Sequence, residues 1–369
     1  MKEYKLSEIL TIKNGRDYKN LKNGLYPVYG SGGLMCTVDN YLYERPSVLL
    51  PRKGTLSNIQ FADSPFWTVD TLYYTEIDTH LADPYYLYYY LKQLDLTRLD
   101  SGTGVPSMTF DSYYNIKVCL PNIDKQRAVG QLLSVVDDKI QLNKRINDNL
   151  EAIAKQLYDY WFVQFDFPNE EGKPYKSSGG AMVWNEKLKR EIPQGWNLLT
   201  ISGVLDKYPT TKRYETKEYL QTGTYPIIDQ GDAYIVGFTN ENDNLLTRHP
   251  AILFGDHSTK VKFLDFDFAR GADGTQILYS SNKAVSQYYL YLVVSSLQIP
   301  NPGYSRHFKY LKELPIVIPS LSIATKFMNI VKPLFKKWTK NIFNNIALTK
   351  QRDELLPLLM NGQASVNSD

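Results

Sequence analysis

Residues 123–161 decide the fold, and they read IDKQRAVGQLLSVVDDKIQLNKRINDNLEAIAKQLYDYW. Within them an apolar residue recurs at every seventh position, with one asparagine in the series. The heptad positions are Val129, Val136, Asn143, Leu150 and Leu157. A series of this length predicts a long amphipathic helix that buries one seam against another helix. A single Asn on such a seam lowers stability but fixes the register of the pair.

The same pattern occurs a second time, 198 residues later, where residues 323–359 read IATKFMNIVKPLFKKWTKNIFNNIALTKQRDELLPLL. Its heptad positions are Phe327, Leu334, Asn341, Leu348 and Leu355. Because the asparagine falls at the same place, we expect the two helices to pair with each other. If the two halves are related by a pseudo-two-fold axis, the pair is antiparallel. We also expect Pro333 to kink the second helix and Pro357 to disturb its end.

A strand-rich region precedes each helix, and the two regions match in order. The matching segments are 26–32 with 225–231, 48–55 with 252–259, 85–88 with 288–291, and 118–121 with 316–319. Their apolar runs are short and rich in β-branched and aromatic residues, which predicts strands. One short helix is expected in each region, near 84–94 and 286–296. The chain is therefore predicted to contain a duplicated module.

The predicted fold is α+β, with two tandem modules, each strand-rich and mixed α/β, joined by two long antiparallel coiled-coil helices. The expected parts are 1–120 (first module), 121–162 (first long helix), 163–195 (linker), 196–318 (second module), 319–362 (second long helix) and 363–369 (tail). Such helices would act as a spacer between the modules.

Composition excludes several classes of protein. No window of eighteen uninterrupted apolar residues is present, and the N-terminus has no apolar signal region. The two cysteines, Cys36 and Cys119, form neither a disulfide framework nor a zinc pattern. These features favour a cytoplasmic chain. The net charge of only +3 means that any nucleic-acid surface must come from local placement of charge.

Motifs that could carry catalysis have simpler structural interpretations. Residues 83–86 (DPYY) and 301–304 (NPGY) lack the second proline of amino-methyltransferase motifs, and Asp83 before Pro84 is typical of a helix start. The chain has no phosphate-binding P-loop, and its four histidines show no metal spacing. We therefore expect no catalysis and no cofactor or metal bound by this chain.

At this point the chain resembles a known family, the specificity subunits of type I restriction–modification systems, over nearly its whole length. The resemblance rests on the two modules, the helix openings 121–126 and 319–321, the run 157–165 (LYDYWFVQF) and the ending 355–362 (LLPLLMNG). One departure is that Lys125-Gln126-Arg127 in the first helix corresponds to Ile323-Ala324-Thr325 in the second.

The resemblance implies a function and a set of partners. The modules would be target recognition domains that read the two halves of a split site in double-stranded DNA. Two methyltransferase (modification) subunits would flank the helices, and translocase–endonuclease (restriction) subunits would join them in defence against foreign DNA. AdoMet, ATP and Mg would be bound by those partners, and no membrane would be involved.

The matched loops carry side chains that suit DNA recognition, because Arg and Lys contact guanine or phosphate while Asn, Gln, Ser and His contact bases. In the first module the candidates are Tyr29, Ser31, Arg52, Lys53, Ser57, Asn58, Thr103 and Ser107. In the second they are Gln230, His257, Ser258, Lys260, Tyr304, Ser305, Arg306 and His307. The loops differ between the modules while the framework repeats, as expected for readers of different half-sites.

Two other functions remain open at this stage. A self-contained enzyme, such as a fused methyltransferase, would bind AdoMet on the isolated chain. A scaffold whose modules bind ligands other than DNA would fail a gel shift with random duplex DNA.

Overall fold

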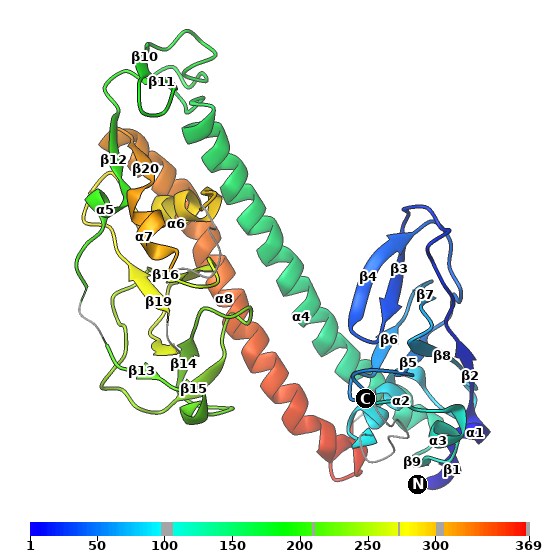
Figure 1. The fold of residues 1–369 in the computed structure, drawn as a ribbon. Helices are drawn as coiled ribbons and strands as arrows, with labels where there is room; N and C mark the ends of the chain where they lie inside the picture. Colours follow the sequence, from blue (N-terminus) through cyan, green and yellow to red (C-terminus); the bar gives the residue numbers. More distant parts are fainter. Residues whose placement is uncertain (97–105, 209–210, 272–273, 300–305, 367–369) are drawn as a thin grey trace. The chain divides into compact units, whose positions relative to one another are not determined.

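The computed structural model describes residues 1–96, 106–208, 211–271, 274–299 and 306–366, and the chain divides into two compact units (Figure 1). Unit 1 comprises Met1–Leu142 with Asn345–Asp369, and unit 2 comprises Asn143–Asn344. The long helices α4 (Ile123–Tyr158) and α8 (Leu321–Met360) each contribute residues to both units. Each unit therefore holds one module together with one end of each long helix.

The module of unit 1 contains a four-stranded sheet of order β2-β8-β5-β6, a three-stranded sheet of order β4-β3-β7, and the pair β1-β9. Its strands are β1 (Lys2–Lys5), β2 (Leu10–Asn14), β3 (Tyr26–Gly30), β4 (Gly33–Val38), β5 (Ser47–Pro51), β6 (Gln60–Ala62), β7 (Trp67–Thr68), β8 (Leu72–Ile77) and β9 (Lys117–Leu120). Its helices are α1 (Leu6–Ile9), α2 (Pro84–Lys92) and α3 (Phe110–Tyr114).

The module of unit 2 contains a sheet of order β13-β18-β14-β15, a sheet of order β17-β16-β19, and the pair β12-β20. Its strands are β12 (Asn197–Thr200), β13 (Arg213–Tyr214), β14 (Tyr225–Ile228), β15 (Gly237–Thr239), β16 (Ala251–Gly255), β17 (Val261–Leu264), β18 (Ala269–Gly271), β19 (Thr275–Leu278) and β20 (Pro315–Ile318). Its helices are α5 (Ile201–Val204), a 3-10 turn (Thr216–Glu218), α6 (Gln287–Ser296) and α7 (Phe308–Glu313).

The two modules share one pattern of strand pairing. The parallel pair β3-β7 corresponds to β14-β18, and the antiparallel pairs of β5 with β6 and β8 correspond to those of β16 with β17 and β19. The edges differ, because β2 pairs with β8 in unit 1 whereas β13 pairs with β18 in unit 2. The predicted duplication is confirmed in the topology of the sheets.

In unit 2 the long helices run antiparallel and meet through asparagines. Asn341 Nδ2 donates to Asn147 Oδ1 over 2.9 Å, and Asn147 Nδ2 donates to the carbonyl of Trp338 over 3.0 Å. Further along, the rings of Trp161 and Phe327 lie 5.6 Å apart, so residue numbers rise along one helix as they fall along the other. The predicted Asn341 therefore pairs with an asparagine that the heptad series did not include.

Unit 1 repeats this arrangement with the helices exchanged. Asn345 Nδ2 donates to the carbonyl of Ile140 over 3.2 Å, which is the counterpart, at the 198-residue offset, of the bond that Asn147 makes in unit 2. Arg352 pairs with Asp137 over 2.5 Å further along the same seam, again in the antiparallel sense. A side-chain amide therefore fixes the equivalent register in each unit, Asn147 in unit 2 and Asn345 in unit 1.

Most predicted seam positions are covered. Val129, Asn143, Phe327 and Asn341 are buried, and Val136, Leu150, Leu157, Leu334 and Leu348 are half-buried. Leu355 is the exception, since it is 42% exposed while Leu359 and Met360 pack into the core of unit 1. A strict seven-residue repeat drifts around an α-helix, so its last position has rotated out of the seam.

The two long helices are continuous. The first passes at Tyr158 into a π-helical turn (Asp159–Val163), and the second continues as α-helix through Pro333 and Pro357, so neither proline ends it. After the π-helical turn, the linker forms the hairpin β10 (Met182–Asn185) and β11 (Arg190–Pro193). In the described ranges, no helix has a long enough apolar stretch to cross a membrane.

Candidate nucleic-acid interface

In module 1 backbone hydrogen bonds connect the turn after β5 to the loop before β8 and to the segment that follows the predicted loop 103–107. The N–H of Arg52 donates to the carbonyl of Thr71 over 2.9 Å, and its own carbonyl accepts from Met108 over 3.0 Å. Lys53 forms a bridge with Ser107. The buried strand β5 ends at this turn, so the core of the module holds the base of the loop cluster in place.

The loop after β3 joins the same cluster through side-chain amides. Asn58 Nδ2 donates to the carbonyl of Ser31 over 2.7 Å, and Gln60 Nε2 donates to the carbonyl of Gly30 over 2.8 Å. Gly54 has φ +92°, and a Cβ there would lie 3.3 Å from Ser31 Oγ. The structure thus brings the predicted residues Ser31, Asn58 and Ser107 to one surface.

Arg52 is the side chain of this cluster best placed to bind an anion or a base edge. Its Nη1 donates to the carbonyl of Asp70 over 3.3 Å, and its guanidinium lies 6.0 Å from the centre of the Tyr73 ring. No ion pair between Arg52 and a carboxylate occurs among the described residues. Lys53 and Ser57 are exposed beside it, so cationic and hydroxyl donors face solvent together.

Two predicted contacts of module 1 remain predictions. The side chain of Tyr29 is half-buried, its ring lies 6.3 Å from that of Phe66, and burial raises the pKa of its hydroxyl. An aromatic residue at the end of a strand is as typical of core packing as of ligand binding. Thr103 lies outside the described residues.

A hollow of about 820 Å³ adjoins this cluster, and the sequence analysis did not anticipate it. It is lined by Asp17–Lys19, Gly30–Met35 and Val69–Thr71. The exposed side chains of Leu34 and Met35 at its edge are 65% and 52% accessible. The only sequence signal for this site was the glycine-rich turn, since Asp17–Lys19 are distant in the chain and are brought near by the strand pairing.

Module 2 assembles its loops in the same way. The N–H of Asp256 donates to the carbonyl of Gly274 over 2.7 Å, and its carbonyl accepts from the N–H of His307 over 2.8 Å, as Arg52 does with Thr71 and Met108. Gln230 is bound to the turn on both sides. Its Oε1 accepts from the N–H of His257 over 3.0 Å, and its carbonyl accepts from Ser258 Oγ over 2.7 Å.

His307 is corrected from a DNA contact to a structural residue. It is only 3% exposed, and its Nδ1 lies 3.0 Å from the carbonyl of Asp256, which holds the segment before α7 against the turn. The Asp256 carboxylate is equally committed, because Oδ1 accepts from the N–H of Phe308 over 2.8 Å. Arg306 is exposed, and Tyr304 and Ser305 lie outside the described residues.

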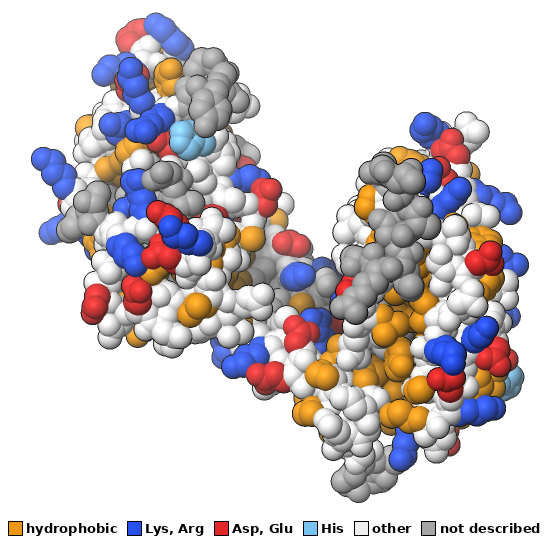
Figure 2. All heavy atoms as spheres, turned by 60° about the horizontal axis from the view of Figure 1, so that its bottom comes forward, with side chains coloured by type: hydrophobic (Ala, Val, Ile, Leu, Met, Phe, Trp, Pro, Cys, Tyr) orange, Lys and Arg blue, Asp and Glu red, His pale blue; other side chains and the backbone are white. Residues whose placement is uncertain are grey.

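Two lysines that follow the turn of module 2, Lys260 and Lys262, lie near carboxylates. Lys260 Nζ lies 2.6 Å from Asp232 Oδ1, and the buried Lys262 donates to the carbonyl of Ala233 over 2.5 Å with Asp229 at 3.8 Å. Burial lowers the pKa of Lys262. Figure 2 shows blue and red side chains interspersed over the visible face, which agrees with the small net charge. Any difference between the two loop clusters in DNA binding must therefore come from the placement of individual side chains, because the overall charge does not provide it.

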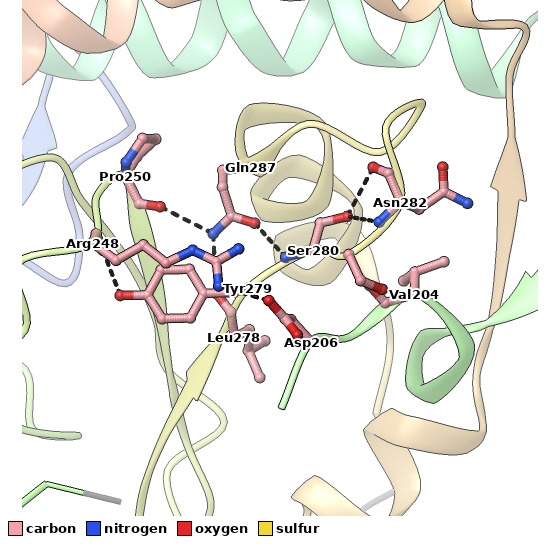
Figure 3. Close-up of polar contacts among 10 residues, drawn as sticks. Val204, Asp206, Arg248, Pro250, Leu278, Tyr279, Ser280, Asn282 and Gln287 are labelled. Carbon is pink, nitrogen blue, oxygen red and sulfur yellow. Dashed lines mark hydrogen bonds and ion pairs between the residues drawn. The ribbon is translucent and has the colours of Figure 1, made fainter. Parts of the chain in front are cut away.

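The end of β16 away from these loops carries a polar network that is structural (Figure 3). Gln287 Nε2 donates to the carbonyls of Pro250 and Leu278 over 3.1 and 3.0 Å, and its Oε1 accepts from the N–H of Ser280 over 2.7 Å. Arg248 pairs with Asp206 over 2.6 Å. These groups satisfy one another and secure the start of α6.

The methyltransferase-like DPYY segment is a helix start, as predicted. Asp83 is the N-cap of α2, its Oδ1 accepts from the N–H of Tyr86 over 2.9 Å, and Pro84 occupies the first turn. Burial raises the pKa of Asp83, with the backbone hydrogen bonds of Tyr86 and Tyr85 opposing it. In the part of the chain that the structure describes, no three His, Cys, Asp or Glu residues gather as a metal site.

Comparison with known proteins identifies the family. Residues 1–152 and 193–348 match the family model described as Type I restriction modification DNA specificity domain. The MjaIX specificity subunit of Methanocaldococcus jannaschii is 24% identical over 354 residues, covering 88% of this chain and 79% of that protein. The EcoR124I/EcoR124II specificity subunit of Escherichia coli is 28% identical over 195 residues, or 47% of each chain.

A solved structure supports the same fold. The S subunit of a type I restriction–modification system from M. genitalium superposes with a TM-score of 0.65 at 18% identity, covering 100% of this chain and 96% of that one. The family model covers both modules and most of both long helices. The chain therefore belongs to the type I restriction–modification specificity subunits and is a non-catalytic member of that system.

Proposed function

We propose that this chain reads a bipartite site in double-stranded DNA, one half with each module. It thereby directs adenine methylation and restriction that partner subunits carry out. The relatives named above are specificity subunits, and the loop clusters supply the donors that phosphate and base contacts use. The partners would be two methyltransferase subunits and the translocase–endonuclease subunits, with AdoMet, ATP and Mg on those partners. We expect the complex to act in the cytoplasm.

One observation carries the proposal: the two loop clusters share a backbone frame but not a chemistry. Arg52 and Asp256 occupy equivalent places, and each gives its carbonyl and N–H to equivalent neighbours. At this place module 1 has a guanidinium, whereas module 2 has a buried carboxylate that accepts a backbone hydrogen bond, so the exposed groups around it differ. A repeated frame with different exposed groups is what two readers of different sequences require, because only groups that reach base edges discriminate bases.

The test exchanges one module. Residues 1–120 are replaced by the first module of a relative, and the hybrid is expressed with its methyltransferase partner in a host without other adenine methylation. Mapping of methylated adenines over the genome should show one half of the recognised site changed and the other half kept. A hybrid that assembles and methylates with both halves altered would contradict independent readers.

A second experiment tests the division of labour. The purified chain alone should bind duplex DNA in a gel shift but transfer no methyl group from AdoMet and cut no DNA with ATP and Mg. Adding the methyltransferase subunit should restore methylation. Methyl transfer by the isolated chain would favour a fused enzyme, and absence of any DNA binding, with or without the partner, would favour a scaffold.

A further inference from the structure

Arg270 is a buried cation with no carboxylate partner among the described residues. It lies in β18, in the middle of the sheet of module 2, and only 5% of its surface is exposed. Its Nη2 donates to the carbonyl of Thr275 over 2.5 Å, but its Nε has no hydrogen-bond partner. Among the described residues, no carboxylate pairs with it. An arginine in this state is unusual, because buried charges in proteins are normally paired.

A second arginine adds to the cost of this arrangement. Arg213 of β13 pairs in register with Arg270, and paired residues of neighbouring strands direct their side chains to the same side of a sheet. Burial, and then the charge of Arg213, lower the pKa of Arg270 to about 10. Both effects disfavour the charged form of the Arg270 side chain in the folded protein.

The position of Arg270 explains what it could serve. The Thr275 that accepts its hydrogen bond pairs with Gly255 at the end of β16, where the turn 256–260 begins. The carbonyl of Gly274, one residue before Thr275, accepts a hydrogen bond from the N–H of Asp256. The guanidinium therefore lies at the base of the candidate DNA-binding loops of module 2.

In module 1 an arginine without a described carboxylate partner lies at a different position of the shared backbone frame. Arg270 pairs with Ile228 of β14 as Thr68 pairs with Tyr29 of β3, so Thr68 occupies the equivalent of the Arg270 position. In exchange, Arg52 of the module 1 turn corresponds to Asp256 in module 2. Each loop cluster thus contains a guanidinium without a carboxylate partner among the described residues, supplied from the turn in module 1 and from the strand below it in module 2. The exposed Arg306 is a further cation of the module 2 cluster.

We propose that Arg270 is an anion-binding residue of module 2, which holds a backbone phosphate of the bound DNA against the loop cluster. The proposal rests on the DNA-binding function proposed above. A phosphate would supply a counter-charge that no described residue provides, and its field is strong at a site of low dielectric. A base edge is a less suitable ligand, because a side chain that is 5% exposed does not project into a groove.

The test measures DNA affinity and folding stability together in the full chain. Arg270→Gln removes the charge, and Arg270→Lys keeps it without the planar fork. Arg248→Gln is the matched control, because Arg248 is in the same module, carries the same charge and is already paired with Asp206 at the other end of β16 (Figure 3). Each protein is titrated with a fluorescent random-sequence duplex over a series of salt concentrations, and its thermal unfolding midpoint is recorded.

The expected result has two parts. Arg270→Gln should bind about five- to tenfold more weakly at low salt, and the slope of log K against log salt should become shallower by about one. Its unfolding midpoint should rise by a few degrees, because an unpaired buried charge has been removed. Arg270→Lys should recover most of the slope, and Arg248→Gln should keep the slope of the native chain.

Three results would overturn the proposal. A lower unfolding midpoint for Arg270→Gln would make Arg270 a structural residue, whatever its effect on binding. An unchanged salt slope would show that no phosphate is neutralised there. Methylome mapping that finds a changed base in the second half-site would assign Arg270 to base readout. If the native chain binds no duplex either alone or with its methyltransferase partner, the proposed function fails, which is distinguishable from each of these.

Discussion

The two units hold the same pair of helices against the same kind of module with different chemistry. In unit 1, Asp137 of α4 accepts from Tyr89 Oη over 2.7 Å and pairs with Arg352 of α8 over 2.5 Å. Burial and the bond to Asp137 raise the pKa of Tyr89 far above its ordinary value, so it remains a donor. In unit 2, the residue equivalent to Asp137 is Phe335, whose ring lies 4.5 Å from that of Phe263.

A second difference lies at the start of each long helix. In unit 1, Gln126 Oε1 accepts from the N–H of Asp83, and its Nε2 donates to the carbonyls of Leu81 and Pro121. Unit 2 has the apolar Ala324 at the equivalent place, and there Gln287 secures the first turn of the short helix instead (Figure 3). The same backbone arrangement is thus stabilised by different side chains in the two units.

Among variants that test this difference between the units, the largest expected loss of stability is in unit 2. Phe335→Ala should destabilise the chain by about 3–5 kcal/mol, because it removes a buried ring from an aromatic cluster that cannot close the cavity. Denaturant unfolding gives the magnitude, and hydrogen exchange should show loss of protection first in unit 2. Phe343→Ala, at a ring that is 37% exposed, is the control and should cost clearly less. Equal costs would contradict the assignment of Phe335 as the anchor.

Unit 1 should respond less strongly. Asp137→Ala leaves Arg352 without its main partner, and since the two side chains are 27% and 17% exposed, solvent screening limits the cost to about 1–3 kcal/mol. Changing Asp137→Phe together with Arg352→Ala recreates the pair that unit 2 has at Phe335 and Ala154. This double variant should be more stable than Asp137→Ala alone in denaturant unfolding. A double variant less stable than Asp137→Ala would show that the surroundings of Tyr89 require a polar partner at position 137.

The duplication, the helices and the grouping of the loops could be predicted because each depends on local sequence patterns. Repeated segments reveal a repeated frame, and a frame fixes which loops meet. The heptad series also identified Asn341 but missed its partner Asn147, because it followed one position per heptad while a seam uses two. Leu355 failed for the related reason that the repeat drifts around the helix.

What the sequence could not show is which side chains the frame turns inward. Tyr29 and His307 have types that suit DNA contacts, yet one packs against Phe66 and the other supports the carbonyl of Asp256. Arg270 could not be predicted as a binding residue because it lies in a short strand, whereas the sequence signals for DNA contacts are in the loops. Its significance depends on strand pairing and on the absence of a carboxylate partner among the described residues, which only coordinates reveal.

The comparison of the two loop clusters predicts a smaller, localised effect. Arg52→Gln should weaken discrimination at one position of the first half-site by about 1–3 kcal/mol and leave the second half unchanged. Competition binding with duplexes altered one base at a time measures this. His257→Ala, from the module 2 turn, is the matched variant, and its effect should be confined to the second half. Effects of either variant on both halves would contradict separate readers.

The smallest expected effect on stability comes from lengthening both helices together. Contacts between α4 and α8 occur in both units, so an insertion in one helix alone would break the register in one of them. Four residues added after Leu142 and four after Asn344 lengthen each helix by about 6 Å and turn the seam only slightly, since four residues are close to one turn. At about 3.4 Å per base pair, the gap between half-sites should grow by one to two base pairs while the half-site bases stay the same. Methylome mapping of the variant with its methyltransferase partner measures the gap.

Two residues added at each place would instead swing the apolar stripe by roughly half a turn and should abolish pairing. An active four-residue variant with an unchanged gap would mean that the helices do not set the spacing and that the partner subunits position the modules.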